Sequence, residues 1–131
     1  MTAKTKADIN QLAYLSLALL IILQSASFLV LKYFQYSLNQ QLFFGLIGNN
    51  LMACLIALPI LIALVYLFWK KVIGLEVCLV LAGLISNILD RIIYGGVVDY
   101  FSIFFIPKFN LADIFIVAGC ILLAYKLIRT I

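Results

Sequence analysis

The residues best suited to chemistry in this chain are three aspartates, Asp90, Asp99 and Asp113, out of only five acidic residues in all. All three lie near the ends of strongly apolar segments. An ionisable group in a bilayer is costly enough that it tends to face the interior of a helix bundle and to have a function. Two neighbouring carboxyl groups cannot both ionise cheaply, so one keeps a proton, and such a pair can hydrolyse a peptide bond by general acid–base catalysis. Asp8 and Glu76 lie at helix ends on the opposite side and need no such explanation.

Polar residues accompany Asp90 on its predicted helix. Asn87, Asp90 and Arg91 are spaced i, i+3 and i+4, which places them on one helix face. Side chains of consecutive helical residues point about 100° apart, so an ion pair between Asp90 and Arg91 would be splayed. We therefore interpret this cluster as a scaffold that braces the loops above it.

Asp113 has a similar neighbour in Asn110, three residues before it. This spacing is typical of a helix N-cap and the third helical residue. Two interpretations are open. In one, both residues only satisfy the free amides of the first helical turn; in the other, Asp113 also belongs to a catalytic pair. The local pattern alone favours the cap.

The elements that must position these residues are predicted to be membrane-spanning helices. The chain has 131 residues, of which 67% are hydrophobic and 11% charged, whereas about 25% of residues are charged in soluble domains. A helix needs about 20 apolar residues to cross a bilayer, and the sequence offers four such runs, at about 9–32, 51–69, 72–93 and 110–128. We predict an all-α membrane protein of one domain over residues 1–131, with four transmembrane helices and a small extracytoplasmic β-like or loop region.

The first apolar run has a second interpretation. Lys4 and Lys6 precede it, and Ser25-Ala26-Ser27 has the small residues of a signal-peptide cleavage site. The run continues through Phe28–Leu31 beyond these residues. That continuation favours a retained span over a removed leader.

The connection between the last two spans is expected to contain β structure. Tyr94-Gly95-Gly96 should end the third helix. Val97–Phe105 is rich in β-branched and aromatic residues and should form a short strand or an interfacial hairpin, which Pro107 is expected to stop.

Basic residues are distributed unequally between the two ends of the spans. Six lie on one side and three on the other: Lys4, Lys6, Lys70, Lys71, Lys126 and Arg129 against Lys32, Arg91 and Lys108. The positive-inside rule then places both termini in the cytoplasm and the three aspartates at the outer face. We attribute the net charge of +4 to anchoring of helix ends, and we expect no nucleic-acid partner.

Several other chemistries are excluded or unexpected. The chain has no histidine, which excludes histidine-based triads, haem ligation by histidine and histidine-containing zinc sites. Cys54, Cys78 and Cys120 lie within apolar runs without metal-ligand spacing, so we expect them to pack as small hydrophobic side chains. We predict neither a metal nor a cofactor.

Three short motifs follow one another toward the C-terminus. They read Asn87-Ile88-Leu89-Asp90-Arg91, Val97-Val98-Asp99-Tyr100 and Phe109-Asn110-Leu111-Ala112-Asp113. In this order, on the last two of four spans, they resemble the Asn-x-x-Asp-Arg, Val-Val-Asp-Phe-like and Phe-Asn-x-Ala-Asp elements of the lipoprotein signal peptidase (signal peptidase II) family. The resemblance covers about Ala82–Arg129, and it is the series rather than any single motif that makes it specific.

The resemblance implies a function. It implies an aspartyl endopeptidase of the bacterial cytoplasmic (inner) membrane, with Asp99 and Asp113 as the catalytic pair. The supporting residues of the family's site fall on Asn87, Asp90, Arg91 and Asn110. The implied substrate is a prolipoprotein that carries diacylglycerol on its lipobox cysteine and is cut just before that cysteine. Membrane lipids are the other expected partners, and we expect the enzyme to act as a monomer.

The two catalytic candidates are expected to hold different charges. A helix N-terminus lies beneath Asp113 and favours its anion. We therefore predict that Asp113 is the more acidic partner and that Asp99 more often carries the shared proton.

The N-terminal half departs from the family's pattern. Where the family's first helix has Asp-Gln-x-x-Lys, this chain has Leu23-Gln24-Ser25-Ala26-Ser27 and keeps only the glutamine. The family's next element begins with asparagine and has glycine two residues later; here Asn39 is kept and Gln41 replaces the glycine. Asn39, Phe43 and Phe44 are candidates for substrate contacts, with interfacial anchoring as the alternative.

Two rival functions remain open at this stage. One is a small membrane transporter, which would favour a carboxylate near mid-membrane; the second span has no charge and the first has none between Asp8 and Lys32. The other is an inactive relative that binds lipidated segments without cutting them, which the departures in the N-terminal half leave open.

Overall fold

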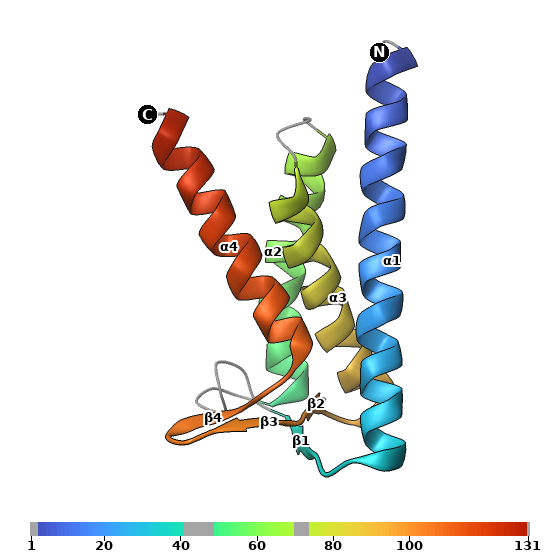
Figure 1. The fold of residues 1–131 in the computed structure, drawn as a ribbon, viewed down its shortest axis with the longest axis vertical. Coiled ribbons are helices and arrows are strands. Elements are labelled where there is room, and N and C mark those ends of the chain that lie inside the picture. The colour runs from blue at the N-terminus through green and yellow to red at the C-terminus, as the bar shows by residue number, and fades with distance from the viewer. Residues whose placement is uncertain (1–2, 41–48, 70–73, 131) are drawn as a thin grey trace.

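The computed structural model describes residues 3–40, 49–69 and 74–130. Its four helices are α1 (Ala3–Tyr33), α2 (Asn50–Trp69), α3 (Leu75–Tyr94) and α4 (Leu111–Thr130). Its short strands are β1 (Ser37–Asn39), β2 (Val97–Asp99), β3 (Phe101–Ile103) and β4 (Ile106–Phe109). The strands gather at one end of the helices, and both chain termini lie at the other end (Figure 1). The predicted fold class, a helical membrane protein with a small β-like region, is confirmed.

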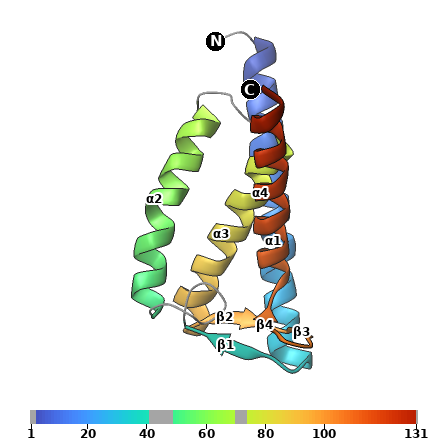
Figure 2. The same ribbon diagram turned by 90° about the vertical axis from the view of Figure 1, so that its left-hand side faces the viewer.

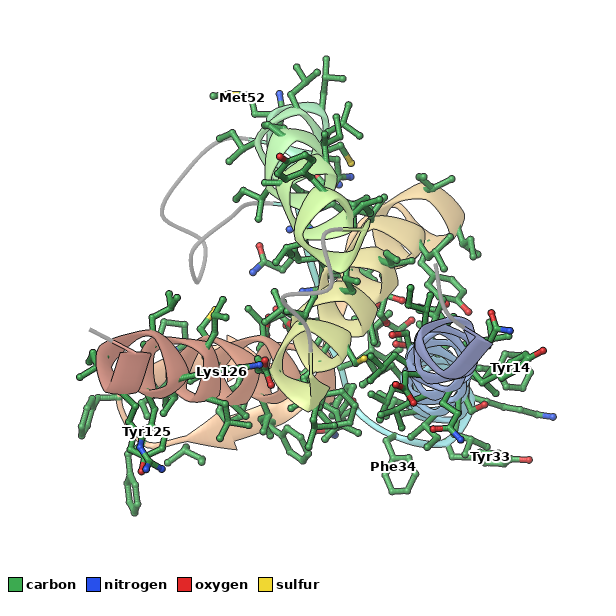
Figure 3. The ribbon with its side chains drawn as sticks, turned by 90° about the horizontal axis from the view of Figure 1, so that it is seen from above. Tyr14, Tyr33, Phe34, Met52, Tyr125 and Lys126 are labelled. Carbon is green, nitrogen blue, oxygen red and sulfur yellow. The ribbon has the colours of Figure 1, made fainter. Side chains whose placement is uncertain are left out.

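Three of these helices are long and apolar enough to cross a membrane. Within the described part of the chain they span Asp8–Tyr33, Leu75–Tyr94 and Leu111–Arg129, and a shorter apolar helix covers Asn50–Tyr66. Large side chains such as Tyr14, Met52 and Tyr125 point away from the helices (Figure 3). So much outward-facing apolar surface marks a protein that contacts lipid.

α3 lies between the other three helices and packs against each of them (Figures 2 and 3). Its hydrophobic contacts run in two directions. Toward α2, Leu64 joins a cluster with residues of α3, and toward α1 and α4 a second cluster contains Leu23, Ala82 and Ala112. α3 is therefore the central element of the fold, and its polar residues are held among those of its neighbours.

Two glycines allow α3 and α4 to approach closely. A Cβ atom at Gly83 would lie 2.8 Å from the carbonyl oxygen of Ala112, and one at Gly119 would lie 2.6 Å from that of Glu76. At the terminal end, Lys126 points toward α3 and its Nζ lies 2.8 Å from Glu76 Oε1 (Figure 3). Close backbone packing and one ion pair thus join the two helices along their length.

The helix bounds differ from the predicted spans for a physical reason. α1 begins at Ala3, well before residue 9, because hydropathy locates the apolar part of a helix while the backbone can continue its turns into water. The predicted start of the third span, residue 72, lies outside the described residues; α3 is helical from Leu75. Its end at the predicted glycine break is confirmed, since Gly95 has the left-handed φ of 81° that glycine adopts readily.

The segment between α3 and α4 forms three strands, which belong to two separate two-stranded sheets. β2 pairs antiparallel with β1, so that Ser37 lies opposite Asp99, while β3 and β4 form a hairpin. The prediction that Pro107 ends this region is wrong, because Pro107 lies within β4. The β3–β4 register is irregular between Phe101 and Ile103, and a proline is tolerated at such a site because no regular ladder bond needs its missing N–H.

Candidate active site

Asp99 ends β2 at the strand-bearing end of the bundle. The two residues before it, Val97 and Val98, are fully buried, and β1 covers the strand from one side. The Asp99 side chain is only 2% exposed, and the Asn39 side chain hydrogen-bonds to its carboxyl group. Its Oδ1 atom has no hydrogen-bond partner among the described residues. One oxygen of this carboxyl is therefore held, and the other is not committed to the fold.

The surroundings of Asp99 favour its protonated form. Burial raises the pKa of Asp99 to about 7, and the nearby Asp113 carboxyl contributes in the same direction. The hydrogen bond from Asn39 and the charge of Arg91 act against this rise. Desolvation is the dominant cause, because a carboxylate removed from water loses solvation that a single donor does not replace.

Asp113 lies in the first turn of α4, where it forms a reciprocal cap with Asn110. The backbone N–H of Asp113 donates to Asn110 Oδ1 at 2.9 Å, and the backbone N–H of Asn110 donates to Asp113 Oδ2 at 3.0 Å. This arrangement is a capping box and confirms the predicted cap. It uses only one oxygen of the carboxyl group, so capping and a role in a site are compatible.

Asn87 connects this cap to α3. Its Nδ2 donates to Asp113 Oδ1 at 3.2 Å, and its Oδ1 accepts a hydrogen bond from Asn110 Nδ2 at 3.0 Å. One amide side chain thus acts as donor and acceptor across the helix interface. It fixes the start of α4, and with it Asp113, relative to α3.

Asp90 is almost completely buried and accepts three hydrogen bonds. Its Oδ1 accepts from Gln24 Nε2 at 3.0 Å, and its Oδ2 accepts from Ser27 Oγ at 3.2 Å and from the backbone N–H of Val98 at 3.1 Å. Asp90 therefore joins α1, α3 and β2. Arg91, which follows it, donates from Nη1 to the carbonyl oxygen of Asn87 at 3.2 Å.

The structure brings six of the predicted site residues together: Asp99, Asp113, Asn87, Asp90, Asn110 and Arg91. Asn39, which is predicted to contact substrate, lies beside Asp99, because the pairing of β1 with β2 places it there. Phe43 and Phe44 lie outside the described residues.

Three contributing residues were missed by sequence reasoning. Gln24 and Ser27 reach Asp90 from α1, and the Tyr100 hydroxyl accepts a hydrogen bond from the backbone N–H of Leu111 at 3.1 Å. The available signal for the first two was their spacing of three residues within the apolar part of α1, which places both on one helix face. Tyr100 had a signal too, since it stands beside Asp99 where the family motif has phenylalanine.

Comparisons with known proteins agree with this arrangement. Residues 5–129 match the sequence model of the family described as signal peptidase (SPase) II. The lipoprotein signal peptidase of Clostridium novyi is 35% identical over 107 residues, which cover 73% of this chain and 72% of that protein. The lipoprotein signal peptidase of Caldanaerobacter subterraneus is 35% identical over 111 residues, which cover 78% of this chain and 77% of that protein. The lipoprotein signal peptidase of Caldicellulosiruptor bescii is 34% identical over 85 residues, which cover 63% of this chain and 57% of that protein.

Solved structures resemble the fold. A bacterial membrane enzyme determined at 2.3 Å by the in meso method superposes with a TM-score of 0.83 and 23% identity, covering 92% of this chain and 88% of that one. A second bacterial membrane enzyme, determined at 1.9 Å, superposes with a TM-score of 0.79 and 23% identity. At this identity the likeness concerns the fold alone. The family model matches nearly the whole chain, and two of the relatives are identical at about a third of the aligned positions over most of both lengths. These matches show that the chain belongs to the lipoprotein signal peptidase (signal peptidase II) family.

Proposed function

We propose that this protein is an aspartic endopeptidase whose catalytic residues are Asp99 and Asp113. The observation that carries the proposal is a buried Asp99 carboxyl with one oxygen uncommitted, close enough to Asp113 for that group to raise its pKa. Because two neighbouring carboxyl groups do not both ionise cheaply, we propose that this pair holds one proton between them at neutral pH. This is the state that acid–base hydrolysis of a peptide bond requires.

The two aspartates divide the reaction according to their surroundings. Asp113 accepts hydrogen bonds from Asn87 and from the backbone of Asn110 at a helix N-terminus, and these donors stabilise its anion. Its carboxylate removes a proton from water while the water oxygen attacks the peptide carbonyl carbon. Asp99 donates its proton to the carbonyl oxygen, which gives a tetrahedral gem-diol. Asp113 then donates its proton to the amide nitrogen and Asp99 takes a hydroxyl proton back as the C–N bond breaks.

The proposed substrate is a prolipoprotein with diacylglycerol on its lipobox cysteine, cut just before that cysteine. Both termini lie at the end of the bundle opposite β2, the strand that Asp99 ends (Figure 1), and the excess of basic residues near the termini favours placement of that end in the cytoplasm. The catalytic pair would then lie at the outer face of the bacterial membrane, at the depth where a signal helix ends. We propose that the enzyme works as a monomer embedded in lipid.

Cleavage of a purified diacylglyceryl prolipoprotein in detergent micelles tests this proposal. We expect wild type to release the signal peptide, and we expect Asp99→Asn and Asp113→Asn each to lower kcat by more than about 100-fold, since each removes a general acid or base. Asp8→Asn is the matched control, because it removes a carboxyl group at the far end of α1. Full activity in either site variant would contradict the assignment. Binding without cleavage by the wild type would instead favour an inactive relative.

The orientation has its own test. In a variant without the native cysteines, we expect single cysteines at Gln40 and Tyr94 to react with a membrane-impermeant reagent from outside intact cells. Both residues lie at the strand-bearing end of the helices. If these cysteines react only after the membrane is permeabilised, the proposed topology is wrong and this end of the protein lies in the cytoplasm.

A further inference from the structure

The strongest polar network outside the aspartate pair joins α1 to the strand that carries Asp99. Gln24 and Ser27 lie three residues apart on α1, which runs beside α3 (Figure 1). Both side chains turn toward Asp90, and Ser27 is only 3% exposed. A polar group as deeply buried as the Ser27 hydroxyl is retained where it is satisfied, and its partner here is Asp90.

The direction of every hydrogen bond in this network is determined. The two hydrogens of Gln24 Nε2 serve three acceptors, so one hydrogen is shared: the Ser86 carbonyl oxygen at 3.1 Å, Ser86 Oγ at 2.9 Å and Asp90 Oδ1 at 3.0 Å. A flipped amide would place its oxygen against the Ser86 carbonyl and the Asp90 carboxylate, both of which are acceptors. Gln24 is therefore held in one orientation, and it holds Asp90 in turn.

The far side of Asp90 meets the backbone next to Asp99. Asp90 Oδ2 accepts from Ser27 Oγ at 3.2 Å and from the Val98 N–H at 3.1 Å. Val98 immediately precedes Asp99 and is fully buried. Because one carboxylate oxygen takes both bonds, a shift of Asp90 toward or away from α1 displaces the Val98 peptide and with it the Asp99 side chain.

We infer that Gln24 and Ser27 are positioning residues for the catalytic pair, acting through Asp90 and the Val98 amide to fix the Asp99 carboxyl relative to Asp113. The inference rests on the proposed function. It makes α1, which contributes no catalytic candidate, a determinant of catalytic geometry. Neither residue contacts substrate in this account, so their loss affects the rate of the chemical step and leaves substrate affinity in place.

The test compares Ser27→Ala, Gln24→Leu and the conservative variant Ser27→Thr with wild type. Ser27→Ala and Gln24→Leu are each expected to lower kcat by about tenfold, the effect of losing a hydrogen bond to a charged group, with KM unchanged within about twofold. Ser27→Thr keeps the hydroxyl and is expected to restore most of kcat. Ser16→Ala is the matched control, because Ser16 is on the same helix and its hydroxyl donates to the carbonyl oxygen of Leu12, within the same helix, at 3.0 Å.

A second readout does not depend on cleavage. Amide hydrogen exchange at Val98, measured by NMR in the same micelles, is expected to be faster in Ser27→Ala and Gln24→Leu than in wild type and unchanged in Ser16→Ala. Unchanged Val98 exchange in both α1 variants would overturn the inference, as would a rise in KM with kcat intact. If wild type does not cleave, the proposed function fails, and the exchange measurement alone decides whether the α1 network holds β2.

Discussion

At the residue scale, the two aspartates differ in the donors around them. Asp113 has a donor at each oxygen, whereas Asp99 has one oxygen without a partner among the described residues. Hydrogen bonding favours a carboxylate and burial disfavours it. From this asymmetry we expect Asp99 to hold the proton and Asp113 the negative charge, which is also the prediction of the helix-dipole argument from the sequence.

The raised pKa of Asp99 predicts a pH-dependent stability. The folded-state value is about 7 against a usual 3.8, so between these limits the native state binds more protons than the unfolded state. The free energy of unfolding should then fall as pH rises from about 4 to about 7, by at most about 1.4 kcal/mol per pH unit, and level off above. Thermal unfolding across this range should show the slope in wild type and in Asp8→Asn and a smaller slope in Asp99→Asn. An unchanged slope in Asp99→Asn would contradict the raised value.

Tyr100 provides a second residue-scale prediction. Its hydroxyl accepts the Leu111 N–H at 3.1 Å, which is one of the free amides at the start of α4. Tyr100→Phe leaves that amide without its acceptor, at a cost of about 1 kcal/mol, and should lower Tm by roughly 2–8 °C together with a fall in kcat as the Asp113 turn loosens. Tyr125→Phe, on the outward face of α4, should leave both unchanged. A Tm equal to wild type in Tyr100→Phe would show that the contact does not stabilise the helix start.

At the element scale, the separation of α3 and α4 determines whether Asn87 can reach Asp113. Gly83 lies one turn before Asn87, and its missing side chain leaves room for Ala112, the residue before Asp113. Small residues at a helix interface in lipid allow this approach. The distance between the helices is therefore set by residues that take no part in the hydrogen-bond network.

A larger side chain at position 83 should push α4 away from α3 and so move Asp113 away from Asn87. In Gly83→Ala the new methyl group would lie 2.8 Å from the Ala112 carbonyl oxygen, which is shorter than a non-bonded contact. We expect a loss of about 1–3 kcal/mol of stability, typical of overpacking, and at least a tenfold fall in cleavage rate. Ala124→Val, which adds bulk on the exposed side of α4, should be near neutral. Activity and Tm as in wild type would mean that α4 shifts without affecting the site.

At the scale of the whole molecule, hydropathy and local spacing predicted the helices and the cap. Four apolar runs, the Gly95 break and the Asn110–Asp113 cap all depend on residues close together in sequence, where periodicity and turn chemistry are informative. The series of motifs around Asp99 and Asp113 indicated the family, which the comparisons confirmed.

The rest depends on contacts between distant segments. The pairing of Ser37 with Asp99, and the reach of Gln24 and Ser27 to Asp90, follow from how each helix is rotated about its axis, which composition and period do not specify. Pro107 was misjudged for the same reason, since its tolerance in β4 depends on the irregular register opposite it. The geometry of the proposed catalytic pair is thus encoded mostly in tertiary contacts, while the helices and strands that carry the pair are encoded locally.

The proposed mechanism depends on coupling between the Asp99 and Asp113 carboxyl groups, and an NMR titration of the 13C-labelled Asp99 carboxyl measures this coupling. In wild type we predict an apparent pKa of about 7 for Asp99. In Asp113→Asn the like charge is gone, so the pKa of Asp99 should move down toward its usual range. An Asp99 carboxyl that titrates at the same pH in both proteins would show that the two groups are not coupled and would contradict the shared-proton mechanism.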